Sequence, residues 1–102
     1  MTLTDPGWPY VIEVVASAKF AAASTGYGHI AVTANGEFVT NGRSPWLDNG
    51  GLAPAHAAGA TAAMEGPATV VLTMEPVSMS SGSSLTVNPG ANTGLTVIQH
   101  PA

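Results

Sequence analysis

The sequence predicts a mainly β protein, built as a small antiparallel β-sandwich or β-barrel. Three observations favour this class: an Asn-Gly dipeptide between two apolar runs, about six or seven β-rich runs at spacings of about 8–12 residues, and turn residues in the gaps between them. We expect one domain over residues 10–102, preceded by an extended arm over residues 1–9. Helix should be limited to one or two short turns.

The first nine residues read as the arm because prolines punctuate them. Pro6 and Pro9 push the residues before them toward extended conformations, and Gly7 adds a turn signal. Trp8 lies inside this segment and needs a place to bury its large ring. That place is either the core of the same chain or a neighbouring subunit.

A strand is predicted from Tyr10 to Val15, where β-branched residues are concentrated. Residues 16–24 are ambiguous, because their alanines and lysine favour helix. The run is short for an isolated helix, and alternate apolar residues around Phe20 would line one face of a strand. We therefore expect the strand to continue through this segment.

The clearest local signal is a hairpin over residues 28–42. Asn35-Gly36 favours the positive φ angles of a type I′ turn, and a two-residue loop fixes the pairing register. Thr33 would then lie opposite Phe38 and Val32 opposite Val39, and the regular pairing would continue away from the turn. Both faces carry apolar side chains, so we expect the hairpin to lie between two layers, or between one layer and another molecule.

Beyond the hairpin, residues 44–48 read as a loop that carries Trp46. The alanine-rich segment 52–66 has Pro54 at a plausible helix start, and we expect one or two helical turns there or an irregular path.

The last third of the chain is again β-rich. Residues 70–79 alternate with the period of a half-buried strand, interrupted at Pro76. Residues 85–87 and 95–98 flank a longer loop and are predicted to form a second hairpin.

Charged residues make up only 8% of the chain, against about 25% in an average soluble domain. Lys19 and Arg43 are the only lysine and arginine, too few to neutralise a nucleic-acid backbone or to attract anionic lipid. No apolar run is long enough to span a bilayer, and we recognise no signal peptide at the N-terminus. These features exclude nucleic-acid and membrane partners and predict synthesis in the cytoplasm of a host cell.

The scarcity of charge admits two interpretations. One is a small, neutral soluble domain. The other, which we favour, is a subunit whose surface is largely covered by other subunits, because charge is depleted at the centres of protein interfaces.

No motif for catalysis or metal binding is recognisable. His29, His56 and His100 lack partners at metal-ligand spacing, the carboxylates are scattered, and there is no cysteine, nucleophile elbow or phosphate-binding loop. We therefore expect neither an enzyme nor a cofactor.

Two stretches resemble small structural proteins of tailed-bacteriophage virions. Residues 28–39, GHIAVTANGEFV, are similar to a hairpin of head decoration proteins, and residues 65–72, EGPATVVL, are similar to an apolar strand that follows an alanine-rich segment in them. The resemblance implies a β-tulip-like body on the outer capsid lattice, often a trimer, which contacts the major capsid protein through its arm.

On this interpretation the chain is a capsid decoration subunit located at the virion surface. Its partners would be the major capsid protein or other virion subunits, together with copies of itself in a homo-oligomer, most simply a trimer. The residues expected to contact partners are Trp8, Pro9, Tyr10 and Trp46. The alternative is a β-sandwich binding module of a phage fibre or a cell-surface assembly, which recognises a glycan or receptor through Trp46.

Overall fold

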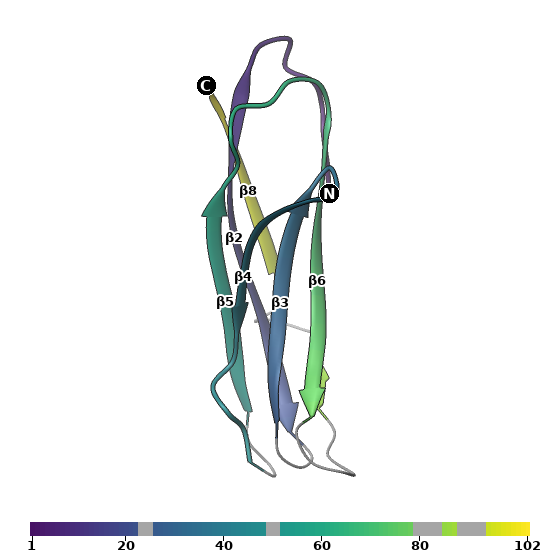
Figure 1. The fold of residues 1–102 in the computed structure, drawn as a ribbon, viewed down its shortest axis with the longest axis vertical. Coiled ribbons are helices and arrows are strands. Elements are labelled where there is room, and N and C mark those ends of the chain that lie inside the picture. The colour runs from purple at the N-terminus through teal and green to yellow at the C-terminus, as the bar shows by residue number, and fades with distance from the viewer. Residues whose placement is uncertain (23–25, 49–51, 79–84, 88–93) are drawn as a thin grey trace.

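The protein is seen in a computed structural model that describes residues 1–22, 26–48, 52–78, 85–87 and 94–102. These residues form an elongated molecule of 50 × 24 × 17 Å, mainly β and without helix in the described ranges (Figure 1). The predicted sandwich-like class is confirmed, and the two sheets do not close into a barrel. The strands are β1 (Thr2–Leu3), β2 (Tyr10–Ala22), β3 (Gly26–Ala34), β4 (Glu37–Arg43), β5 (Leu52–Ala60), β6 (Ala68–Ser78), β7 (Leu85–Val87) and β8 (Gly94–Pro101).

Two antiparallel sheets face each other. The first has the strand order β1-β6-β3-β4, and the second has the order β5-β2-β7, with β8 also paired to β2. β7 and β8 lie end to end along one edge of β2, with Val87 opposite Phe20 and Gly94 opposite Ser17. The predicted hairpin between these two runs is therefore wrong: β2 is long enough to pair with both, so they do not need to pair with each other.

β2 supplies more of the core than any other strand. Its alternate side chains point between the sheets and are buried, while Glu13 and Val15 on the other face are exposed. The predicted strand is confirmed through Ala22, and residues 23 and 24 lie outside the described ranges. The buried residues of β2 are Tyr10, Ile12, Val14, Ala16, Ala18 and Phe20.

Within the alanine-rich segment 52–66, expected to be helical or irregular, Leu52–Ala60 is instead a strand, whereas residues 61–66 follow an irregular path. β5 pairs with β2 along its whole length, from Ala60 opposite Glu13 to Leu52 opposite Ala21. Tertiary pairing overrides the weak helical preference of alanine here. Ala55 and Ala57 are buried, and their small side chains allow the facing strands to approach closely.

The edge strands β4 and β5 close one side of the sandwich. Thr40 donates a hydrogen bond from Oγ1 to the carbonyl of Ala58 at 3.0 Å. A Cβ atom built on Gly42 would lie 1.9 Å from the carbonyl oxygen of His56, and one on Gly59 would lie 2.8 Å from Cβ of Thr40. The two strands can approach this closely only because glycine occupies both positions.

The hairpin of β3 and β4 confirms the predicted turn but not the whole register. Asn35 and Gly36 have φ angles of 51° and 81°, and Thr33 lies opposite Phe38 as expected. A bulge at the next pair then places Thr40, rather than Val39, opposite Val32.

Among the described residues, the second sheet covers one face of the hairpin and no further layer of this chain covers the other. Ile30 and Val32 are buried against the second sheet, whereas the Phe38 side chain is 66% exposed on the other face. The outward side chains of β3 are only half-buried, by their neighbours within the sheet.

β6 runs without a break through Pro76, where the sequence predicted an interruption. Pro76 lies opposite Gly28, whose N–H and C=O point away from β6 and bond to Ser44. The pair is therefore not hydrogen-bonded, and the nitrogen of Pro76 faces the outer edge of the sheet. β1 covers that edge only at Ala68 and Thr69, so proline costs no ladder bond at this position.

The first nine residues lie on the body in this structure. β1 pairs with β6, and Met1 and Val70 exchange hydrogen bonds of 2.9 and 2.8 Å. The chain then crosses to the second sheet, where Tyr10 is completely buried and donates its hydroxyl proton to the carbonyl oxygen of Gly66. The Trp8 and Tyr10 rings are perpendicular to each other, with their centroids 6.2 Å apart.

Removing the Tyr10 hydroxyl should have a small, measurable cost. We expect Tyr10→Phe to lower the free energy of unfolding by about 1 kcal/mol, the typical net value of one hydrogen bond. Urea unfolding followed by circular dichroism measures the change. Tyr27→Phe is the matched control, because the Tyr27 hydroxyl makes no hydrogen bond within the described residues; an equal loss in both variants would contradict the assignment.

Candidate functional site

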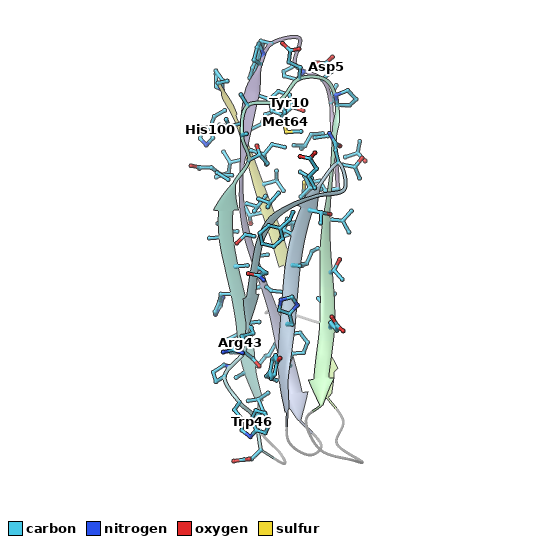
Figure 2. The ribbon with its side chains drawn as sticks, in the orientation of Figure 1. Asp5, Tyr10, Arg43, Trp46, Met64 and His100 are labelled. Carbon is cyan, nitrogen blue, oxygen red and sulfur yellow. The ribbon has the colours of Figure 1, made fainter. Side chains whose placement is uncertain are left out.

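The four residues predicted as partner contacts do not form one site. Tyr10 and Trp46 lie near opposite ends of the long axis (Figure 2), which we name the Tyr10 end and the Trp46 end. Trp8 and Pro9 are exposed at the Tyr10 end. Tyr10 itself is fully buried, so its side chain belongs to the core and is not available to a partner.

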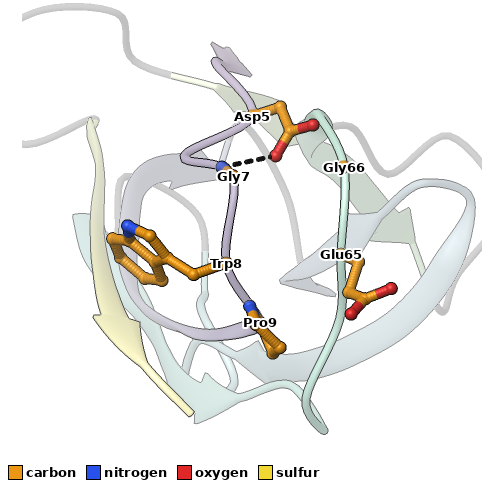
Figure 3. Close-up of a pocket in the computed structure, with 6 residues that line it drawn as sticks. All are labelled: Asp5, Gly7, Trp8, Pro9, Glu65 and Gly66. Atoms are coloured by element: carbon orange, nitrogen blue, oxygen red, sulfur yellow. Dashed lines mark hydrogen bonds between the residues drawn. The ribbon is translucent and has the colours of Figure 1, made fainter.

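A hollow of about 250 Å³ at the Tyr10 end is bordered by two chain segments (Figure 3). Asp5 Oδ1 accepts a 2.8 Å hydrogen bond from the backbone N–H of Gly7, which fixes the turn before Trp8. The indole of Trp8 points away from Glu65 on the facing segment. The lining residues carry two carboxylates and no cation, so this hollow disfavours anionic ligands.

The Trp46 end presents a loop that is tightly bound to β3. Ser44 is buried, donates its N–H to the carbonyl of Gly28 and accepts the N–H of Gly28 on Oγ, both at 2.8 Å. Leu47 exchanges two backbone hydrogen bonds with Gly26, of 2.7 and 3.0 Å, and its side chain is buried. Trp46 lies between these two anchors, so its backbone position is fixed while its side chain is 52% exposed.

Polar side chains surround this loop on the outer face of the first sheet. The Arg43 guanidinium lies over the Tyr27 ring, 5.4 Å from its centroid. Arg43 is opposite His29 in the register, and Asn41 Nδ2 lies 3.4 Å from His29 Nε2. These side chains and the loop border two adjoining hollows of about 370 and 360 Å³, which share Tyr27 and Arg43.

No protein-family model, curated protein or solved structure matches this chain. Among the described residues, no three His, Cys, Asp or Glu side chains gather in a way that could hold a metal ion. No helix in the described ranges is long and apolar enough to cross a membrane.

Sequence reasoning identified Trp46 but not the polar residues beside it. Arg43 and Tyr27 are far apart in the chain, and the bulge in the hairpin decides which residues of β4 lie beside His29. The available signal was the hairpin itself: once its two strands are paired, outward residues near its open end must share one face.

Apolar side chains are exposed on the outer faces of both sheets. On the second sheet, Val15 is 56% exposed and Ile98 is 47% exposed, with Ala58 and Thr96 next to Val15 in the register. These four residues form what we call the Ile98 patch.

On the first sheet, a row of outward residues crosses three strands near the Tyr10 end. Phe38 lies opposite Thr33, and Thr33 lies opposite Val71 on its other side. Phe38 and Val71 are both exposed. These three residues form the Phe38 patch, on the face of the molecule opposite the Ile98 patch.

Proposed function

We propose that the chain is a structural virion protein, a decoration subunit that binds the outer surface of a capsid and stabilises it by protein–protein contacts. The observation that carries this proposal is the pair of exposed apolar patches on opposite faces of a thin, charge-poor molecule. Its partners are the major capsid protein or other virion subunits, and copies of itself.

Both patches are well suited to contact with protein. Large exposed side chains such as Phe38 and Ile98 gain free energy when a neighbour covers them, at about 25 cal/mol per Å² of apolar area. In the Phe38 patch the uncharged Thr33 lies between the two apolar side chains, so a partner can approach its centre without desolvating a charge. In the Ile98 patch Val15 has the uncharged Ala58 and Thr96 beside it, whereas Ile98 lies opposite the exposed Glu13, which contacts His100 at the margin of the patch.

The arrangement favours contacts between unlike surfaces. A twofold dimer uses one self-complementary patch, whereas two different patches on opposite faces support head-to-tail contacts that close into rings or extend across a lattice. A trimeric ring on a capsid is the simplest closed form of such an arrangement. Trp8 and Pro9, exposed at the Tyr10 end, add a further contact for the underlying shell.

Particle stoichiometry tests this proposal. We expect virions purified from the natural source to contain the chain in numbers comparable to the major capsid subunit, as measured by quantitative mass spectrometry. Many weak contacts of one kind then stabilise the shell through multivalency. Absence of the chain from purified particles, or only a few copies in each, would contradict a decoration role.

The patches should determine occupancy on the particle. We expect Ile98→Lys and Phe38→Lys each to reduce the bound copies at least tenfold, because central apolar contacts supply most of the energy of an interface. Thr4→Lys is the control, since it adds the same charge at an exposed position outside both patches and outside the hollow that Phe38 borders. Equal occupancy of all three variants would show that neither patch is the interface.

A further inference from the structure

Arg43 is a cation with no anionic partner among the residues that the structure describes. Within the described ranges the Glu13 carboxylate contacts His100, and no carboxylate lies within ion-pair distance of Arg43. The acid nearest in the register is Glu75, which lies across β3 on β6, two strands away and therefore roughly 10 Å distant between backbones. In a chain of net charge −4, this guanidinium is available for an external anion.

The geometry of Arg43 suits a carboxylate. Its planar fork of N–H groups can bind the two oxygens of a carboxylate at once, which a lysine ammonium cannot do. The cation–π contact with Tyr27 favours one position of the guanidinium before any ligand arrives, so less conformational entropy is lost on binding.

Trp46 supplies an exposed apolar surface in the same hollow as this cation. Both residues border the same hollow of about 370 Å³, and hydrogen bonds of Ser44 and Leu47 to β3 hold the loop on either side of the indole. A sugar ring has an apolar C–H face and a polar rim, and the exposed face of an indole can pack against the former. The loop therefore holds the backbone of Trp46 in place and leaves its indole exposed for packing against a sugar.

The adjoining hollow supplies hydrogen-bonding groups. It is bordered by Asn41 and His29 and shares Tyr27 and Arg43 with the first hollow. An exposed amide and an imidazole can donate to or accept from sugar hydroxyls. Each hollow lies in the size range of small-ligand sites, so neighbouring sugar units of a chain could occupy both.

We propose that the outer face of the first sheet at the Trp46 end binds a glycan that carries a carboxylate, of the uronic-acid or sialic-acid type. Arg43 binds the carboxylate, Trp46 packs against the sugar ring, and Asn41 and His29 bind its hydroxyls. This site is separate from the Phe38 patch, since Tyr27 and Thr33 are six residues apart along β3, roughly 20 Å. The inference does not depend on a decoration role.

A titration followed by ¹H–¹⁵N NMR tests the site directly, because the chain has only two tryptophans and hence two indole N–H signals. We expect methyl β-D-glucuronide or N-acetylneuraminic acid to shift the Trp46 signal saturably and to leave the Trp8 signal in place. Methyl β-D-glucoside, which lacks the carboxylate, should bind at least tenfold more weakly. Absence of a saturable shift, or equal affinity for the glucoside, would overturn the proposal.

Two simple anions separate a glycan site from a general anion site. Acetate and inorganic phosphate should each bind at least tenfold more weakly than the acidic sugar, since neither can pack against Trp46. If either binds as tightly as the sugar, Arg43 is only an anion contact and the glycan assignment is wrong.

The chain offers matched control variants for both groups. Arg43→Gln and Trp46→Ala should each weaken binding of the acidic sugar at least tenfold. Lys19→Gln is the control for charge, because Lys19 is the one lysine of the chain and lies outside the site. Trp8→Ala is the control for the indole, because Trp8 is the second tryptophan and lies at the Tyr10 end. Both control variants should bind the acidic sugar as tightly as the wild type does. Amide signal dispersion verifies that each variant is folded, and unchanged affinity in folded Arg43→Gln or Trp46→Ala would refute the site.

Discussion

Replacing Phe20 with alanine is expected to lower the free energy of unfolding by about 3–5 kcal/mol. The ring is fully buried and lies directly against β3, where a Cβ built on Gly28 would be 2.1 Å from its atoms. No side chain on Gly28 can fill the space that the ring leaves. Urea unfolding measures the loss, and Phe20→Leu provides a milder variant if the alanine protein does not fold.

The contact with Gly28 can be isolated by a double-mutant cycle. Gly28→Ala alone should cost about 1–3 kcal/mol or more, because the new methyl group overlaps the Phe20 ring. In a Phe20→Leu background, Gly28→Ala should lower the free energy of unfolding by less than it does in the wild type. The difference between the two losses is the coupling free energy, which we expect to be about 0.5–3 kcal/mol. Gly94→Ala is the control, since nothing lies within 4 Å of the added methyl group. Strict additivity of the two substitutions would contradict this packing.

The second large effect is expected at Gly42, where β4 and β5 meet. Gly42→Ala would place a methyl group 1.9 Å from the carbonyl oxygen of His56, so the two strands must separate. We expect a loss of at least about 3 kcal/mol in the free energy of unfolding, at the upper end of the overpacking range. Thermal and urea unfolding both measure it.

At Gly42 the added methyl group would meet a backbone atom, whereas at Gly28 it would meet the side chain of Phe20. Shortening the side chain of His56 to alanine cannot move its carbonyl oxygen, so His56→Ala should not rescue Gly42→Ala. Rescue would mean that the strands do not approach as closely as the structure shows.

The fold class could be predicted from the sequence because its signals are local. β-branched residues and alternation mark β2 and β6, and Asn35-Gly36 specifies its own turn. These features act within a few residues and do not require knowledge of distant partners.

The errors arise where distant parts of the chain decide the outcome. β5 is alanine-rich and has little strand preference of its own; it is a strand because β2 offers it an unpaired edge. β7 and β8 look like a hairpin in isolation, yet both pair with β2. The candidate site was predictable only in part, for the same reason. Trp46 can be recognised from the sequence as an aromatic residue in a loop. The position of Arg43 over Tyr27 cannot, because it depends on how the strands pair.

The pairing of β2 also has a consequence for how the protein is made. Tyr10 lies opposite Pro101, and the backbone N–H of Ala102 donates to the carbonyl of Pro9 at 3.0 Å. β2 leaves the ribosome well before β8 and must therefore wait for this partner. Such high contact order slows folding, and until β8 arrives the β2 edge is open to wrong partners. Nascent chains of this protein would then depend on chaperones more than the small size of the domain suggests.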